Sequence, residues 1–159
     1  MKQATLGFLV KRNSKNKITD VCLAMKKRGL GVDKWNGSGG KFKKSEDGSI
    51  SNCLIRELKE EINVEVIKHK KIGTLKFLFD ASIDYSMNVH IYLVENWKNE
   101  PSESEEMKPK WFKVENIPYE DMWEDDKYWL HHILNDKEIL GTITFNKDNV
   151  IRKISLSIK

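Results

Sequence analysis

The chain has 159 residues, a formal net charge of +4 and 33% charged residues. This length suits a single domain, residues 1–159, whose core is large enough to fold without disulfides. No apolar run is long enough to span a membrane and no secretion signal is visible, so we expect a cytoplasmic protein without a membrane partner. The surplus lysines are scattered and no nucleic-acid-binding motif accompanies them, so we expect no nucleic acid partner and a monomer.

The hydrophobic pattern predicts an α+β protein. Strands are expected over residues 5–10 and 18–25, joined as a hairpin across a polar turn. A loop and a glycine-rich turn then lead into a helix that begins at Ser49 or Ser51, since either can cap it. The later expected elements are a β-like stretch over 64–79 with a break at Lys70-Lys71, a turn over 80–86, a strand over 87–94, an acidic loop over 96–107, a short strand over 110–114, a helix over 125–134 and a closing hairpin of strands 141–145 and 150–158. This order predicts a mixed, curved β-sheet sandwiched between α-helices.

The first predicted helix has two chemically different faces. Its apolar residues recur at every fourth position and would face a core; they are Leu54, Leu58 and Ile62. Glu57, Glu60 and Glu61 share another face, where each like-charge pair costs a few tenths of a kcal/mol. A divalent cation would turn this repulsion into a binding site, and oxygen ligands favour Mg²⁺ or Mn²⁺. The alternative for an acidic helix is a solvated face.

The glycines just before this helix, Gly37, Gly39 and Gly40, allow the backbone to approach a ligand closely. Together, the turn and the helix resemble the Nudix box, G-x5-E-x7-R-E-U-x-E-E-x-G-U, in which U is a bulky aliphatic residue. The matching positions are Gly40, Arg56, Glu57, Leu58, Glu60, Glu61 and Val64.

The sequence departs from this box at two places. Asn63 stands where the box has its last glycine, and Asn tolerates the left-handed conformation that ends a helix. From Gly40 to Arg56 there are 16 positions where the box has 14, so Glu46 is correctly spaced from Gly40 only, and counting back from Arg56 places the glutamate position on Gly48. We interpret this as a two-residue insertion, and predict that the segment between Gly40 and the helix is a surface loop that does not carry the chemistry.

The resemblance to the Nudix family implies attack of water on a diphosphate linkage, assisted by Mg²⁺. The implied metal ligands are Glu57, Glu60, Glu61 and the carbonyl group of Gly39. Arg56 is placed to orient Glu60, one helical turn away. The general base is either a glutamate of the box or Glu106, and the expected products are pyrophosphate and a nucleoside monophosphate.

Three further segments, MKKRG, SEEMKPKWF and DMWEDDKYW, resemble the animal-type oxidised purine nucleoside triphosphatases within this family, the 8-oxo-dGTP diphosphatases. This resemblance implies that the base stacks on Trp123 and is read by Asn36, Asp125 and Asp126. The other nucleotide contacts that it implies are Thr5, Lys26, Phe77, Met87 and Phe145. Leu30 stands where that group has a phenylalanine, so substrate preference can differ.

Each of these residues also has an ordinary structural explanation. The phenylalanines on strands would be core residues, Asn36 a turn residue and Asp125 a helix N-terminal charge, and we expect Trp129 to be core. Two adjacent carboxyl groups in an apolar slot cannot both ionise cheaply, so one pKa should rise and that group could then donate to a purine carbonyl.

We therefore expect Mg²⁺-dependent hydrolysis of oxidised purine nucleoside triphosphates such as 8-oxo-dGTP and 2-hydroxy-dATP, which would sanitise the nucleotide pool. The alternatives are a broader Nudix pyrophosphatase and an inactive nucleotide-binding module. The intact Arg56 and glutamates argue against the inactive module.

Overall fold

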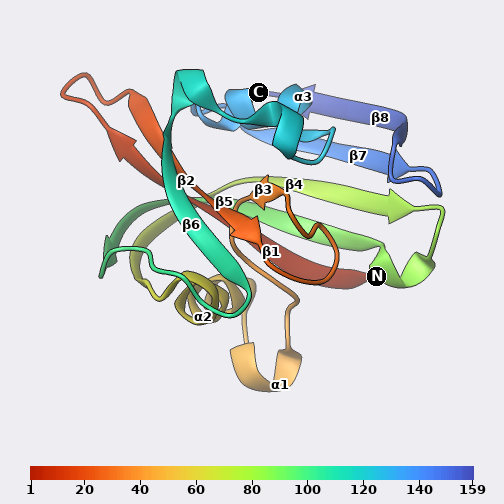
Figure 1. Ribbon diagram of the computed structural model, residues 1–159, viewed down its shortest axis with the longest axis horizontal. Helices are drawn as coiled ribbons and strands as arrows, with labels where there is room; N and C mark the ends of the chain where they lie inside the picture. The colour runs from red at the N-terminus through yellow and green to blue at the C-terminus, as the bar shows by residue number, and fades with distance from the viewer.

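A mixed eight-stranded β-sheet forms the centre of the computed structural model, which describes residues 1–159 (Figure 1). The strands are β1 (Lys2–Arg12), β2 (Ile18–Lys26), β3 (Trp35–Asn36), β4 (Glu65–Phe79), β5 (Met87–Lys98), β6 (Met107–Lys113), β7 (Ile139–Phe145) and β8 (Ile151–Ile158). Their order is β3-β2-β1-β5-β4-β7-β8, and β6 pairs with β2. The β1–β5 and β4–β7 pairs are parallel and the others antiparallel, so the predicted mixed sheet is confirmed.

Helices cover both faces of this sheet. They are α1 (Lys44–Asp47), α2 (Ile50–Ile62) and α3 (Asp126–Ile133), and short 3₁₀ turns span Ile83–Tyr85, Val114–Asn116 and Tyr119–Asp121. Figure 1 shows α2 below the sheet and α3 above it. None of these helices combines the length and the apolar character needed to cross a membrane.

The alternation of side chains along β5 explains why two separate cores form. Tyr92 and Val94 belong to the cluster that buries the apolar face of α2, whereas Ile91 and Leu93 belong to the cluster around Trp129 of α3. Successive residues of a strand point to opposite faces, so one strand supplies both cores. The predicted core residues of α2 are fully buried: Leu54, Leu58 and Ile62.

Both ends of α2 are fixed by local hydrogen bonds. Ser49, one of the two predicted caps, accepts a hydrogen bond from the backbone N–H of Asn52 at 3.1 Å. Asn63 ends the helix in the left-handed conformation, with φ of 61°. Its side-chain amide also donates to Ser102 Oγ at 2.9 Å and to the carbonyl oxygens of Ser102 and Glu103. A glycine at this position could not make these bonds, which tie the acidic segment before β6 to the end of α2.

Three sequence predictions about the elements need correction. The predicted break at Lys70-Lys71 is a register shift between Lys71 and Gly73 within a continuous β4. The predicted acidic loop over 96–107 is shorter, because β5 continues to Lys98 through pairing with β4, and β6 already begins at Met107. The segment predicted to be a surface loop contains α1, which ends at the buried Asp47.

Replacing Asn63 tests both of its roles at the end of α2. Asn63→Gly keeps access to the left-handed conformation but loses the amide hydrogen bonds, so we expect a loss of about 0.5–1.5 kcal/mol in the free energy of unfolding. Asn63→Ala also loses these bonds and, unlike Asn, has no polar side chain to offset the left-handed conformation, which adds about 1–2 kcal/mol. Urea denaturation should therefore rank wild type above Asn63→Gly and Asn63→Ala lowest. Equal stability of the two variants would show that the backbone conformation is irrelevant.

Candidate active site

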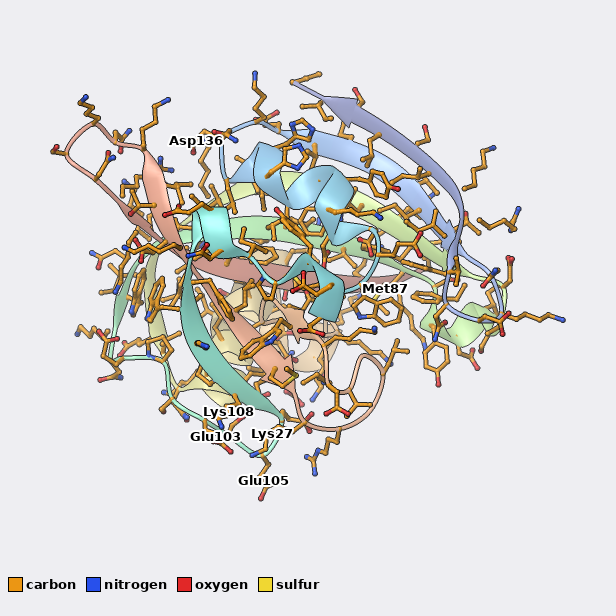
Figure 2. All side chains as sticks on the ribbon, turned by 45° about the horizontal axis from the view of Figure 1, so that its top comes forward. Lys27, Met87, Glu103, Glu105, Lys108 and Asp136 are labelled. Atoms are coloured by element: carbon orange, nitrogen blue, oxygen red, sulfur yellow. The ribbon has the colours of Figure 1, made fainter.

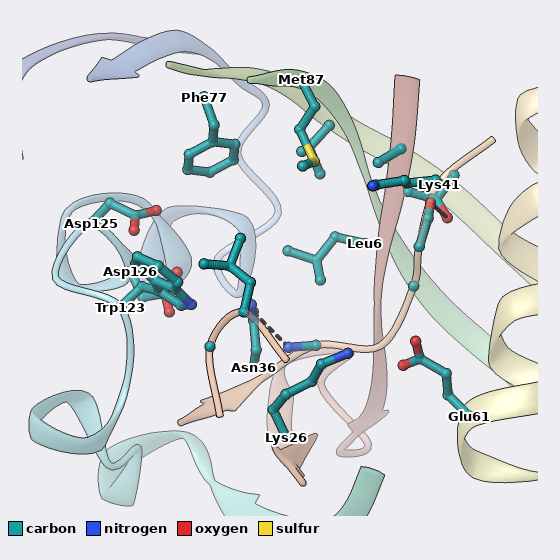
Figure 3. A pocket seen from close by; sticks show the side chains of 18 of the residues that line it. Leu6, Lys26, Asn36, Lys41, Glu61, Phe77, Met87, Trp123, Asp125 and Asp126 are labelled. Atoms are coloured by element: carbon teal, nitrogen blue, oxygen red, sulfur yellow. Dashed lines mark hydrogen bonds between the residues drawn. The ribbon is translucent and has the colours of Figure 1, made fainter. Parts of the chain in front are cut away.

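A cavity of about 350 Å³ opens between the sheet, α3 and the loop that follows β2. Figure 3 shows Trp123, Asp125 and Asp126 at one end of it, and Lys41 and Glu61 at the end nearer α2. Every residue that the sequence implied for nucleotide binding lines this cavity: Thr5, Lys26, Asn36, Phe77, Met87, Trp123, Asp125, Asp126 and Phe145. Among the metal-site residues, Gly39 and Glu61 also line it.

Aromatic rings form the wall at the first end. Phe77 and Phe79 both stack on Phe145, with ring centroids 6.3 Å and 5.1 Å away, respectively. Trp123 packs edge-on against Phe145 at 5.3 Å and against Phe79 at 6.0 Å. Phe79 was not among the predicted nucleotide contacts, although its spacing of two residues from Phe77 on a strand places both rings on one face. The result is an apolar slot with a flat indole beside it.

Asp125 and Asp126 lie at this end and are both almost completely buried. Asp125 Oδ2 accepts a hydrogen bond from Trp129 Nε1 at 2.7 Å, while Asp125 Oδ1 and Asp126 Oδ2 have no partner in the protein. Burial raises the pKa of both carboxyl groups, and the charge of Asp125 raises that of Asp126 further. The prediction that Trp129 is core is confirmed by its full burial, and Trp129 also orients Asp125. Asp125 makes no side-chain cap to α3, so it has no capping bond that would explain its position.

The loop after β2 contributes Leu30 and Gly31 to the lining of the cavity, next to Trp123. Leu30 lines the cavity and is 40% exposed, and Gly31 has a φ of 84°. A Cβ on Gly31 would meet Trp123 Nε1 at 3.0 Å, so this loop is packed closely against the indole. Asn36 Oδ1 accepts a hydrogen bond from the backbone N–H of Gly37 at 2.8 Å (Figure 3), but Asn36 is not a turn residue, because it ends strand β3 and pairs with Ala24 of β2.

Gly39 and Gly40 are required by the close packing of the glycine turn between β1 and α2. A Cβ on Gly39 would lie 2.0 Å from the carbonyl oxygen of Thr5, and a Cβ on Gly40 would lie 2.5 Å from the carboxyl carbon of Glu57. Only glycine permits both approaches. The glycine turn is therefore held against β1 on one side and against the carboxylate helix on the other.

The guanidinium group of Arg56 connects the carboxylates of this region. Its Nη1 donates to Glu57 Oε1 at 2.8 Å and to Glu60 Oε2 at 3.2 Å, so the predicted contact with Glu60 is present. Its Nε and Nη2 donate to the two oxygens of Asp47 at 2.6 Å and 3.0 Å. This bidentate geometry is the strong form of an arginine–carboxylate pair.

Asp47 corrects the prediction that the inserted segment is only a surface loop. Its side chain is 1% exposed, and the hydrogen bond from Arg56 lowers the pKa of Asp47 to about 2. Glu46, which the forward count from Gly40 favoured, is 54% exposed and lies 3.9 Å from Arg56 Nε. One helical turn absorbs the insertion and delivers Asp47, rather than Glu46, to Arg56. Residue counting cannot reveal this, because it does not show where the extra residues bend the chain.

Glu61 and Glu106 differ in their surroundings. Burial, followed by the charge of Glu57, raises the pKa of Glu61 to about 8. Glu106 does not line the cavity; its Oε1 accepts from Arg28 Nε at 2.7 Å and its Oε2 lies 3.4 Å from Lys26 Nζ. The Arg28 hydrogen bond lowers the pKa of Glu106, so this carboxylate is kept ionised.

The box residues fit a hard divalent cation, although no three His, Cys, Asp or Glu side chains converge in the structure as a ready metal cluster. Glu61 Oε2 is buried without a hydrogen-bond partner, an arrangement that is costly unless a proton or a cation satisfies it. The neighbouring donors, Glu57, Glu60 and the Gly39 carbonyl group, are all oxygen ligands. In this arrangement Arg56 partly neutralises Glu57 and Glu60 instead.

Comparisons with known proteins agree with the resemblance found in the sequence. A family model described as NUDIX domain matches residues 1–133. The chain is 44% identical over 131 residues to the oxidized purine nucleoside triphosphate hydrolase of Danio rerio, covering 82% of each protein. It is 40% identical over 136 residues to the protein of the same name from Mus musculus, covering 86% of this chain and 85% of the mouse protein. A MutT protein structure from Bacillus halodurans shares the fold, with a TM-score of 0.81, 24% identity and coverage of 99% and 98%.

The Asp47–Arg56 pair predicts a pH dependence of stability. The folded-state pKa of Asp47, about 2, lies below its ordinary value of 3.8, so the pair stabilises the fold above about pH 4 and this contribution is lost as the pH falls toward 2. The stability difference between wild type and Asp47→Asn should therefore be largest near neutral pH and shrink between pH 4 and 2. Glu46→Gln is the matched control and should show almost no difference. A gap between wild type and Asp47→Asn that stays constant down to about pH 2 would contradict this assignment.

Proposed function

The chain belongs to the Nudix family, and on this premise we propose that it hydrolyses oxidised purine nucleoside triphosphates, such as 8-oxo-dGTP and 2-hydroxy-dATP, to the monophosphate and pyrophosphate. The observation that carries the proposal is one cavity with a buried Asp125–Asp126 pair at one end and Glu61 of α2 at the other (Figure 3). The names of the fish and mouse relatives support the same substrate class. Such an enzyme removes damaged precursors before they enter nucleic acid.

The base is proposed to occupy the aromatic slot. Trp123 offers a ring face for stacking, and Asn36 and the two aspartates offer hydrogen-bonding groups to the base edge. A protonated Asp125 or Asp126 can donate to a purine carbonyl, and an ionised one can accept from a ring N–H. Because burial raises both pKa values, the Asp125–Asp126 pair can hold a proton at neutral pH. Which carboxyl group carries this proton decides which donor and acceptor groups of the purine edge the pair can bind. This chemistry accommodates both oxidised guanine and oxidised adenine.

The triphosphate is proposed to extend from the slot toward α2, where Lys26 and Lys41 line the cavity. A divalent cation, Mg²⁺ or Mn²⁺, held by the Gly39 carbonyl group, Glu57, Glu60 and Glu61 would neutralise phosphate charge there. Arg56 orients Glu57 and Glu60 through its hydrogen bonds. The proton of the attacking water is accepted by a box glutamate or by Glu106.

We propose that the protein works as a cytoplasmic monomer on this small-molecule substrate, without a nucleic acid or membrane partner. Cys22 and Cys53 are both buried free thiols, which is typical of a reducing compartment. All of the proposed site residues come from one chain, so a second copy is not needed to complete the site.

A broader Nudix pyrophosphatase is the second candidate, and Leu30 is the observation that favours it. Leu30 lines the cavity with a smaller side chain than the phenylalanine implied at this position, so the slot is less tightly closed. The deciding experiment measures kcat/KM for 8-oxo-dGTP, 2-hydroxy-dATP, dGTP and dATP with Mg²⁺, and again with a chelator. A higher kcat/KM for the two oxidised substrates supports an enzyme that clears oxidised nucleotides. Equal kcat/KM values for all four favour a broader Nudix pyrophosphatase.

Glu61→Gln keeps the shape of the side chain and removes its charge. If Glu61 holds the cation, kcat should fall by about 10²–10³-fold while the helix stays folded. Glu46→Gln is the matched control on the exposed side of α1 and should retain its turnover. Full turnover of Glu61→Gln, or full turnover of wild type with a chelator, would show that Glu61 does not hold a catalytic cation.

Asp47→Ala removes the bidentate partner that fixes the Arg56 guanidinium group, so Arg56 can shift relative to Glu57 and Glu60. We expect kcat or metal affinity to fall by about 10–100-fold, as for partners that orient metal ligands. Glu46→Ala should stay close to wild type because Glu46 is exposed. If both variants retain their activity, α1 serves only to connect the glycine turn to α2.

Substitutions at the base end should change discrimination more than chemistry. Trp123→Ala removes a stacking partner worth about 1–3 kcal/mol, so affinity should fall by roughly 5–150-fold for every purine. Asp125→Asn and Asp126→Asn each replace a carboxyl group, which can gain or lose a proton, by an amide, which cannot. The losses in kcat/KM for 8-oxo-dGTP and 2-hydroxy-dATP should therefore be unequal. If both variants lower kcat/KM for all four nucleotides by one common factor, the aspartates have a structural role only.

A further inference from the structure

The carboxylate of Glu106 is shared by two cations that lie in different places. Arg28 Nε donates to Glu106 Oε1 at 2.7 Å, and Lys26 Nζ lies 3.4 Å from Glu106 Oε2. Lys26 lines the cavity, whereas Arg28 does not, and the Arg28 side chain is 61% exposed. Each carboxylate oxygen therefore has its own cation, and only one of these cations faces the cavity.

The backbone around Glu106 is anchored on both sides. The backbone N–H of Lys27 donates to the carbonyl oxygen of Glu106 at 2.9 Å. Ser104 Oγ accepts from the backbone N–H of Glu106 at 3.2 Å and donates to the carbonyl oxygen of Glu61 at 2.6 Å. Asn63 also holds Ser102 of the same segment. Because this main chain is tied to both α2 and the loop after β2, a change in the partners of Glu106 is confined to side chains.

We propose that Arg28 is a positioning residue, which keeps the Glu106 carboxylate occupied so that Lys26 is released to the phosphate groups of the substrate. This inference rests on the proposed function, in which Lys26 meets the triphosphate. Lys26 has to leave Glu106 before it can bind a phosphate. With Arg28 still in place, Glu106 does not become an unpaired negative charge beside a polyanion.

The size of the effect follows from the exposure of the partners. Partly exposed ion pairs are weak. Without Arg28, Glu106 should hold Lys26 more strongly, which should weaken substrate binding about two- to fivefold and not abolish it. The effect should fall on affinity and leave the chemical step nearly unchanged. Arg28→Lys retains one cation near Glu106 and should restore most of the affinity.

The experiment measures the Kd of an α,β-methylene analogue of dGTP with Mg²⁺ by calorimetry, for wild type, Arg28→Ala, Arg28→Lys and Lys27→Ala. Lys27→Ala is a matched control because it removes the same charge from the next residue. Lys27 Nζ pairs with Glu103 at 2.6 Å and not with Glu106, and Figure 2 shows these two residues together, apart from Met87 at the cavity. We expect Arg28→Ala to weaken binding about two- to fivefold and Lys27→Ala to change it less. Equal losses would show a general charge effect and overturn the proposal.

The decisive comparison repeats Arg28→Ala in a Glu106→Gln background. With no carboxylate to hold Lys26, Arg28→Ala should no longer change the Kd. The same loss in both backgrounds would mean that Arg28 acts on the phosphates directly, which overturns the proposal. An unchanged Kd for Lys26→Ala would overturn it as well. Hydrolysis of 8-oxo-dGTP by wild type, measured on the same preparation, reports separately whether the proposed function holds.

Discussion

The bidentate pair of Arg56 with Asp47 is the interaction on which the arrangement of the active-site helix depends. Three glutamates on one side of α2 and a fourth carboxylate from α1 would repel one another without a cation among them. Arg56 spreads its donors over Asp47, Glu57 and Glu60, so one side chain both partly neutralises the group and fixes its geometry. Asp47 stays ionised because its pKa is lowered, and its two hydrogen bonds from Arg56 hold the guanidinium group in place beside Glu57 and Glu60.

The cavity joins two groups of carboxylates that have different neighbours. At the base end, Asp125 and Asp126 are buried among aromatic rings, and their raised pKa values favour one protonated carboxyl group over two charges. At the α2 end, burial also raises the pKa of Glu61, but cations lie beside the neighbouring carboxylates: Arg56 at Glu57, and Lys26 at Glu106. The same residue type can thus donate to a neutral base at one end and support charge neutralisation at the other.

The sequence predicted those features that depend on local rules. The apolar repeat of α2, its Ser49 cap and its left-handed Asn63 end were all predicted, because helix period and capping involve neighbouring residues only. The nucleotide contacts that motif resemblance implied all line the cavity. Asp47 was missed because the length of an insertion does not show which of its residues will point toward Arg56. Phe79 was missed because a phenylalanine on a strand is by default a core residue. The full extent of β5 and β6 was missed for a related reason: polar composition favoured a loop, and the pairing that extends these strands comes from distant segments.

The most direct test of the central claim, that Arg56 and Asp47 hold the α2 carboxylates ready for a divalent cation, is a crystal structure of the Mn²⁺-bound protein with the metal located by anomalous scattering. We expect Mn²⁺ in direct contact with carboxylate oxygens of Glu57, Glu60 and Glu61, with the bidentate Asp47–Arg56 pair unchanged. A metal bound away from these three residues, or an Arg56 that has left Asp47, would contradict the claim.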